Sequence, residues 1–284
     1  LSLLSSMPRM QVTPDVVSCN AAISACEKAD EWEQALSLLS SMPRMQVTQD
    51  VISCDAAISA CEKGDEWEQA LSLLSSMPRM QVTPDVISCS AAISACEKGG
   101  QWEWALSLLS SMPRMQVTPN LISCNAAISA CEKGTQWVWA LRLLNTMPEM
   151  QVTLKVISCN AAISACEKGH QWEQALSFLR SMPGMQVTPN VISCDAAISA
   201  CEKGNEWERA LSLMRSMPRM QVTRDVVSCS ASISACEKGD EWEQALSILS
   251  SMTRGMFRTL PILASLVDLF QIQDTLFFNK FLKV

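Results

Sequence analysis

Apolar and small residues recur along the chain in one phrase that repeats every 35 residues. The phrase VVSCNAAISACEKADEWEQALSLLSSMPRMQVTQD occupies residues 16–50 and starts again at 51, 86, 121, 156 and 191. A seventh copy begins at Val226 and departs from the phrase after Met252, and residues 1–15 are the end of a copy that precedes the first. A fixed period of this length indicates a stack of supersecondary units.

Each unit is predicted to hold two helices. In residues 20–28, Ala and Ile fall at helical spacing, and in most units a glycine such as Gly64 follows, which we expect to adopt the left-handed conformation that ends a helix. Asp30, with an acidic residue three positions later, predicts a capping box that opens the second helix. An apolar stripe then runs over residues 32–42, until Pro43 prevents continuation of the helix.

Helices of roughly 9 to 12 residues are marginal in isolation, so each one has to bury its apolar stripe against its partner and the next unit. Repeating that step produces a superhelix with first helices on one surface, second helices on the other, and an open concave groove. We expect this solenoid over residues 1–252, as a partial unit 1–15, six full units 16–225 and a partial unit 226–252. The apolar tail 253–284 is interpreted as a cap of the open end or as a run-on segment.

The charge of the chain is unfavourable for binding a phosphate backbone, since the net charge is −7 and the pI is near 4.9. The acidic residues are concentrated at the ends: residues 16–50 carry −3, residues 51–85 carry −4 and residues 226–252 carry −3. The four units between 86 and 225 sum to +1. A nearly neutral central groove does not exclude a polyanionic ligand, although its affinity would be weaker and less salt-dependent than usual.

Fourteen cysteines form seven pairs spaced C-x6-C, such as Cys19 with Cys26. Helical rise separates such a pair by roughly 10 Å, beyond the ~7 Å that a disulfide tolerates. The spacing matches no zinc motif and His170 is the single histidine, so the sequence predicts free buried thiols in a reducing compartment and no metal site. Most of the nine tryptophans are predicted to pack between helices, whereas Trp104 and Trp139 break the pattern and are expected to be exposed.

The phrase resembles the pentatricopeptide repeat, a 35-residue unit found in organellar RNA-binding proteins, which begins near VVTYNTLI and ends near PD. Here VVSCNAAI and TPD occupy those places, with Lys28 at the thirteenth position and Ala35-Leu36 at the twentieth and twenty-first. The resemblance covers residues 1 to about 252 and implies an all-α fold, a right-handed superhelical α-solenoid of stacked helix-turn-helix repeats. Cys19 and its equivalents depart from the family, which usually has an aromatic residue there.

The resemblance also implies that each unit binds one nucleotide with three side chains. The fifth residue would contact the base edge, the last residue would support it, and the second residue would sandwich the base. The fifth and last positions are Asn20, Asp50, Asp55, Asp85, Ser90, Asn120, Asn125, Lys155, Asn160, Asn190, Asp195, Asp225 and Ser230. The second positions are Val17, Ile52, Ile87, Ile122, Ile157, Ile192 and Val227.

An amide offers both a donor and an acceptor to an unstacked base, and a hydroxyl can serve a purine. Family rules suggest uracil for Asn20 with Asp50, adenine for Ser90 with Asn120 and a pyrimidine for Asn160 with Asn190. The Asp-Asp units and the unit with Asn125 and Lys155 fall outside clear rules. Between the third and thirteenth positions only the fifth varies among units, apart from Ser232, which indicates a reader; variation among helix N-caps is the alternative.

The thirteenth position would meet successive phosphates. These residues are Lys28, Lys63, Lys98, Lys133, Lys168, Lys203 and Lys238. The alternative is that each lysine favours the C-terminal end of the first helix through the helix dipole. Glu27 and its equivalents oppose RNA binding, because residues 20, 24 and 27 share one helical face.

We therefore expect a non-enzymatic protein without cofactors that holds about seven nucleotides of single-stranded RNA in a chloroplast or mitochondrion, and acts in RNA processing, stability or translation. The sequence contains neither the H-x-E nor the P-C-x-x-C motif of a deaminase, and no targeting or membrane-spanning segment is recognised in it. The alternative is a structural solenoid that binds a protein or peptide in the same groove, and an untuned array without a ligand is a third possibility.

Overall fold

The computed structural model describes residues 13–256, with side chains to Met252. Over this range the chain is an all-helical stack of helix-turn-helix units, which confirms the predicted fold class. The predicted cap in the tail lies outside the described residues from 257 onward, as do residues 1–12 of the predicted partial unit.

The helices alternate regularly along the chain. The first helices of the units are α2 (Val16–Lys28), α4 (Val51–Lys63), α6 (Val86–Lys98), α8 (Leu121–Lys133), α10 (Val156–Lys168), α12 (Val191–Lys203) and α14 (Val226–Lys238). The second helices are α3 (Trp32–Ser41), α5 (Trp67–Ser76), α7 (Trp102–Ser111), α9 (Trp137–Thr146), α11 (Trp172–Ser181), α13 (Trp207–Ser216) and α15 (Trp242–Met256). Short 3-10 helices follow five of them: η2 (Met42–Met45), η3 (Met77–Met80), η4 (Met112–Met115), η5 (Met182–Met185) and η6 (Met217–Met220).

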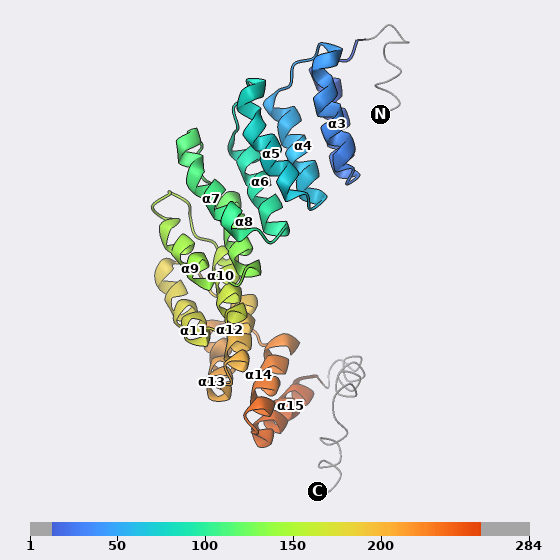
Figure 1. The fold of residues 1–284 in the computed structure, drawn as a ribbon. Coiled ribbons are helices and arrows are strands. Elements are labelled where there is room, and N and C mark those ends of the chain that lie inside the picture. The colour runs from blue at the N-terminus through green and yellow to red at the C-terminus, as the bar shows by residue number, and fades with distance from the viewer. Residues whose placement is uncertain (1–12, 257–284) are drawn as a thin grey trace.

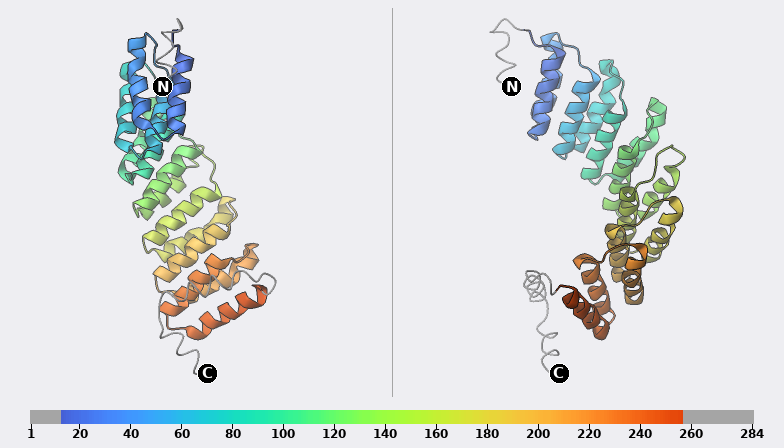
Figure 2. Two further views of the ribbon diagram at one scale, coloured as in Figure 1. Left: turned by 90° about the vertical axis from the view of Figure 1, so that its right-hand side faces the viewer. Right: turned by 180° about the vertical axis from the view of Figure 1, so that it is seen from behind.

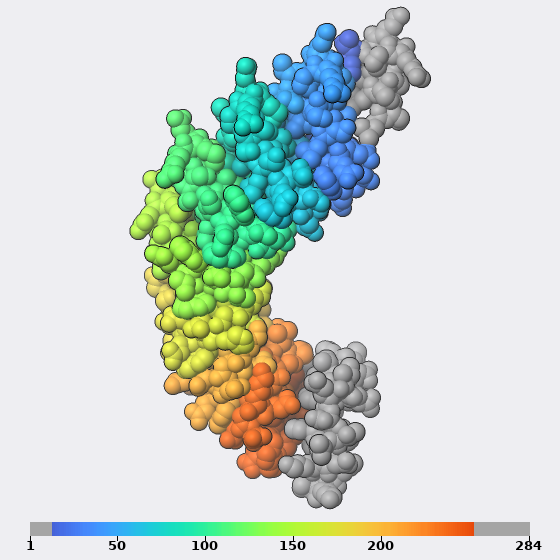
Figure 3. Space-filling model, viewed as in Figure 1, coloured from blue at the N-terminus to red at the C-terminus, as the bar shows by residue number. Residues whose placement is uncertain are grey.

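The stack is bent into an arc whose two ends lie on the same side (Figure 1). Each first helix packs against the first helix of the next unit, whereas each second helix packs mainly against the first helices of its own and the following unit. Through the middle of the arc, α8, α10, α12 and α14 lie toward the concave side, and α7, α9, α11 and α13 lie outside them (Figures 1 and 2). The space-filling view shows the hollow between the two arms of the arc (Figure 3).

The first helix begins four residues earlier than predicted, at the first residue of the unit. Its N-cap is the last residue of the preceding unit: Asp50 accepts a hydrogen bond from the backbone N–H of Ser53 at 2.8 Å, and the Ser53 hydroxyl completes a capping box. The same arrangement opens every described first helix except α10. The fifth position therefore lies inside the helix, and the alternative that Asn20 and its equivalents vary as N-caps is wrong.

The turn between the two helices also differs from the prediction. Gly64 has φ −78°, and the left-handed residue is its successor Asp65, with φ 59°. Asp30 occupies the same left-handed position in the first unit, so the second helix has Glu31 as its N-cap and no side-chain capping bond. The predicted capping box at Asp30 is wrong because Asp and Asn also tolerate left-handed backbone, and the sequence signal for the two roles is the same.

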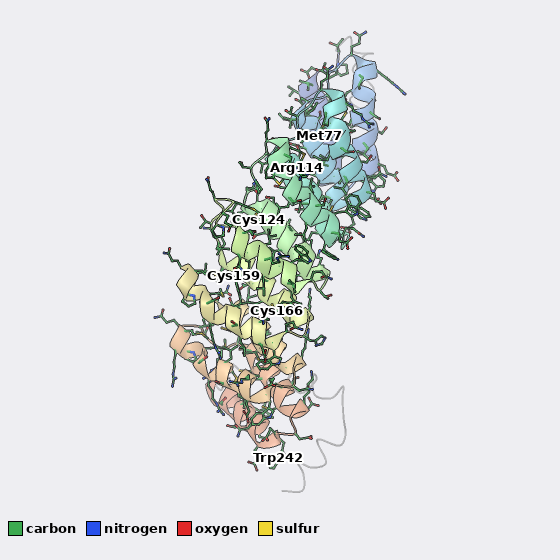
Figure 4. All side chains as sticks on the ribbon, turned by 60° about the vertical axis from the view of Figure 1, so that its left-hand side comes forward. Met77, Arg114, Cys124, Cys159, Cys166 and Trp242 are labelled. Atoms are coloured by element: carbon green, nitrogen blue, oxygen red, sulfur yellow. The ribbon has the colours of Figure 1, made fainter. Side chains whose placement is uncertain are left out.

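Gly64 is needed because a tryptophan of the preceding unit packs against it. A Cβ atom at Gly64 would lie 2.5 Å from Cδ1 and 3.0 Å from Cγ of Trp32. Trp32 is half-buried and joins the hydrophobic core, which agrees with its predicted place between helices. The same contact recurs at the five following unit junctions, and Trp242, after which no described unit follows, is 57% exposed at the end of the stack (Figure 4).

Proline ends the second helix as predicted, and its loss has a visible effect. In the first unit, Pro43 lies in η2, and the turn closes with Gln46 in the left-handed region, at φ 58°. In the last unit Thr253 replaces the proline, and α15 continues to Met256. The missing ring removes the steric block and restores an amide donor, so the helix can continue.

All fourteen cysteines are free and buried, as predicted from their spacing. Burial raises the pKa of most of these thiols; it reaches about 12 at Cys131 and Cys166. Because the thiolate is the reactive form, these side chains act as small core residues. None of the helices between residues 13 and 256 is long and apolar enough to cross a lipid bilayer.

The Trp–Gly contact predicts a specific packing defect. We expect Gly64→Ala to lower the free energy of unfolding by about 1–3 kcal/mol, because the added methyl group overpacks against Trp32. Gly184→Ala is the matched control, since no atom lies within 4 Å of a Cβ placed there. Urea denaturation of both variants measures the difference, and equal stability of the two would contradict the proposed contact.

The missing cap of α10 predicts a stabilising substitution. Lys155 is the N-cap of α10 and makes no side-chain capping bond, whereas Asp or Asn at the other junctions does. Lys155→Asp should raise the free energy of unfolding by about 1 kcal/mol. Lys155→Ala removes the lysine without supplying an acceptor and should show no such gain; a gain of equal size in the alanine variant would show that capping is not its cause.

Candidate functional site

The second and fifth positions lie on the same side of the first helix, because residues three apart are neighbours on a helical surface. The seven second-position side chains are 57–68% exposed although all are Val or Ile. An exposed apolar side chain on each of seven stacked helices is unusual for a folded surface and forms a row that a ligand could contact. The structure thus places the predicted base-sandwiching residues where a ligand could reach them.

The predicted fifth and last residues of a unit meet at the junction with the next unit. Asn20 Nδ2 donates to both carboxylate oxygens of Asp50 at 3.2 Å, and Asn160 Nδ2 donates to Asn190 Oδ1 at 3.2 Å. The last residue lies here because it caps the next first helix. The junction therefore brings together two side chains that are 30 residues apart in sequence.

The pairs are not equivalent along the chain. Ser90 is buried, and its hydroxyl has no hydrogen-bond partner among the described residues; Asn20 Oδ1 and Asp195 Oδ1 share that condition. Ser230 is exposed in the last unit, and Lys155 is exposed and contributes no cap. Unpaired buried polar atoms cost free energy. A ligand group could supply the missing partner at Asn20, Ser90 and Asp195.

A third side chain, which the sequence analysis did not assign, takes part in this junction. The third residue of each unit is a serine, and at three junctions its hydroxyl donates to the fifth residue of the preceding unit. Ser158 and Ser193 donate to Asn125 Oδ1 and Asn160 Oδ1, each at 2.6 Å, and Ser88 donates to Asp55. The sequence did contain a signal for this role: a serine stands at the third position of every unit, three residues after the last residue of the preceding unit.

Two of the fifth residues are carboxylic acids in a partly buried place. Burial raises the pKa of Asp55 to about 6, against the lowering effect of the Ser88 hydrogen bond, and the charges of Asp85 and Asp50 raise it further. Burial, followed by the charge of Asp225, raises the pKa of Asp195 to about 6. These two units can therefore present a neutral carboxyl donor or an anion near neutral pH.

The lysine ladder is already paired with the acidic residues of the same groove. At each of six junctions, the lysine of one unit contacts the preceding unit's glutamate at 2.9–3.5 Å, beginning with Lys63 and Glu27. Each lysine is also the last residue of its first helix, where the helix dipole favours a cation. The glutamates that were expected to oppose RNA are thereby neutralised, and a phosphate would have to compete with them for each lysine.

The remaining candidates have structural roles or face outward. Trp104 and Trp139 are 53% and 42% exposed, as predicted, and the guanidinium of Arg142 lies 5.0 Å from the ring centre of Trp139. Among the described residues, no cluster of His, Cys, Asp and Glu has the arrangement of a metal site.

The sequence matches family models over more than half of its length. Residues 72–133 match the model of the pentatricopeptide repeat domain, and residues 17–47, 52–82, 157–187 and 192–222 match that of a single PPR repeat. No curated protein is significantly similar to the chain in sequence.

Solved structures share the architecture at low sequence identity. The crystal structure of the maize pentatricopeptide repeat protein PPR10 is 16% identical, with a TM-score of 0.58, over 89% of this chain and 41% of PPR10. PPR10 in complex with an 18-nucleotide psaJ RNA element gives 15% identity and a TM-score of 0.50, over 89% of this chain and 42% of that one. The PPR domain of Arabidopsis thaliana protein-only RNase P 1, in complex with tRNA, is 13% identical, with a TM-score of 0.50. That match covers 64% of this chain and 95% of the PPR domain.

The chain spans about two fifths of the length of PPR10, so the resemblance to that protein concerns the stacked units. The matched repeats, the helix pairs and the 35-residue period coincide in register from the first unit onward. This chain belongs to the pentatricopeptide repeat family.

Proposed function

We propose that the chain binds single-stranded RNA in its concave groove, with one nucleotide for each unit and selectivity from the fifth and last residues. The observation that carries the proposal is the meeting of these two side chains at the unit junctions, as in Asn20 with Asp50 and Asn160 with Asn190. An exposed Val or Ile one helical turn away offers an apolar surface for the face of the base.

Two solved relatives of the same fold are bound to RNA, one to a psaJ element and one to tRNA. By analogy with the family, we place the protein in a chloroplast or mitochondrion, where it acts in RNA processing, stability or translation without a catalytic activity of its own. The net charge of −7 and the Lys–Glu pairs argue for modest affinity with little long-range attraction.

The fifth-position amides provide the first test. We expect replacing Asn20, Asn125 and Asn160 together by alanine to weaken RNA binding at least about tenfold, because a hydrogen bond contributes roughly 0.5–1.5 kcal/mol. Fluorescence anisotropy with a labelled random RNA pool at low salt measures the loss. The matched control replaces Gln34, Gln69 and Gln174, which lie on second helices, by alanine.

The control triple variant should bind as the parent protein does, and circular dichroism should show that both variants are folded. If the parent protein binds no single-stranded RNA at low salt, the RNA proposal fails, and a protein or peptide ligand for the groove becomes the function to test.

The acidic units predict a pH dependence of binding. The pKa of both Asp55 and Asp195 is raised to about 6, so lowering the pH from 7.5 to 5.5 protonates the larger part of each carboxyl. Affinity for uridine-rich RNA should rise over this range, because a neutral carboxyl neither repels phosphate nor loses a charge's hydration on binding. Asp55→Asn with Asp195→Asn should flatten the dependence, since Asn stands at this position in other units.

The same titration affects folding with a definite sign. A carboxyl whose pKa is raised in the folded state stabilises that state at low pH and loses this contribution as the pH rises through about 6. The double variant should therefore gain thermal stability over the parent at pH 7.5 and not at pH 4. A pH dependence of thermal stability that survives the double substitution would contradict the assignment to these two carboxyl groups.

A further inference from the structure

The third-position serines lie at the junctions, and their hydroxyls donate to one of two kinds of acceptor. Ser53, Ser123, Ser158, Ser193 and Ser228 are fully buried. A serine hydroxyl carries a single donor hydrogen, so it can donate to only one acceptor at a time. The two acceptors are the N-cap residue of the same helix and the fifth residue of the preceding unit.

The junctions fall into two groups by the direction of this donation. Ser53, Ser123 and Ser228 donate to the backbone carbonyl of their own N-cap, at 2.7 Å, 2.9 Å and 3.0 Å. Ser88, Ser158 and Ser193 donate instead to the fifth residue of the preceding unit. For Ser193 the distance to Asn160 Oδ1 is 2.6 Å, against 2.9 Å to Asn190 Oδ1, so the contact with Asn160 is the shorter.

The N-cap residue differs between two of these junctions. Lys155 has no side-chain acceptor, and the hydroxyl of Ser158 donates to Asn125. Asp50, in contrast, holds the amide nitrogen of Asn20 with both of its oxygens, and Ser53 stays with the Asp50 carbonyl.

The consequence is that identical asparagines present different groups. Asn20 Oδ1 has no partner among the described residues, whereas Asn160 Oδ1 accepts the hydrogen bond from Ser193. Both amides donate one N–H to the last residue of their own unit and retain a second N–H. An amide oxygen has two lone pairs, so Asn20 Oδ1 keeps both acceptor positions, whereas Asn160 Oδ1 has already used one of its two on the Ser193 hydroxyl.

We infer that Ser158 and Ser193 are specificity-determining residues, which engage the amide oxygen of the preceding unit's fifth residue and so disfavour uracil at those units. Uracil presents an N–H donor beside a carbonyl acceptor and needs both amide groups, whereas cytosine presents a ring-nitrogen acceptor that the amide N–H can satisfy. The inference rests on the proposed RNA binding and assigns to a buried, invariant serine a part of the selectivity.

The experiment compares Ser193, which donates to the fifth residue of the preceding unit, with Ser53, which donates to its own N-cap. Full-length Ser193→Ala and Ser53→Ala are tested with RNAs that differ by U or C at the nucleotide aligned with the fifth unit (156–190) or the first unit (16–50). Removing the Ser193 hydroxyl frees Asn160 Oδ1, so the ratio of affinities for U over C at the fifth unit should rise about threefold to tenfold. Ser53→Ala should leave the ratio at the first unit unchanged, although it also loses a capping-box hydroxyl.

Ser158→Ala supplies a second variant with the least risk to folding, because α10 has no capping bond to lose. It should raise the U-over-C ratio at the fourth unit (121–155) in the same way, and Ser193→Thr, which keeps the hydroxyl, should retain the parent ratio. Unchanged ratios in both Ser158→Ala and Ser193→Ala, with RNA still bound, would overturn the inference and leave the proposed function intact. Absence of RNA binding by the parent protein would overturn the proposed function and the inference together.

Discussion

Close packing of each first helix on the next is the contact on which the rest of the structure depends. Neither a 13-residue nor a 10-residue helix is stable alone, so the stack exists only because neighbouring units bury each other. The buried faces of the first helices consist mainly of small side chains, such as Ala57, Ala60 and Cys61, beside one isoleucine such as Ile58, and the small residues allow close approach. Larger Leu, Met and Trp side chains fill the space under the second helices. The stack therefore curves toward its first helices, which is the origin of the concave groove (Figure 2).

Because stability comes from junctions, the candidate site is also built at junctions. The residue that ends one unit caps the first helix of the next, and this places it beside the fifth residue of its own unit. The third-position serine belongs to the same group of contacts. A base would be recognised by side chains that already have a structural role, so each substitution there changes folding and binding together. Effects on binding can therefore be separated from effects on folding by comparing two variants that lose the same capping interaction.

The sequence predicted the period, the helix pairs, the free thiols and the exposed Trp104 and Trp139, because each rests on spacing along one helix or on composition. It failed at helix ends. Asn20 was a candidate cap and Asp30 a predicted cap, but the caps are Asp15 and Glu31. Asp and Asn serve N-caps and left-handed turns equally well, so local residue type could not distinguish them. The Trp–Gly contact and the serine that links two units join residues about 32–33 positions apart, and no local pattern contains that information.

Some of the residues that vary among the units lower the stability of the fold, and this supports the proposal of a ligand. Lys155 gives up a capping bond that Asp or Asn at the same position makes, and Asp55 and Asp195 place partly buried carboxyl groups whose ionisation near neutral pH opposes folding. Neutral drift in a recently multiplied array would be expected mainly at exposed positions, where substitutions have little effect on stability. Here residues that weaken the fold stand at the fifth and last positions, which meet the exposed apolar row. A ligand that contacts those side chains, as proposed for RNA, would give a physical reason for keeping residues that folding alone disfavours.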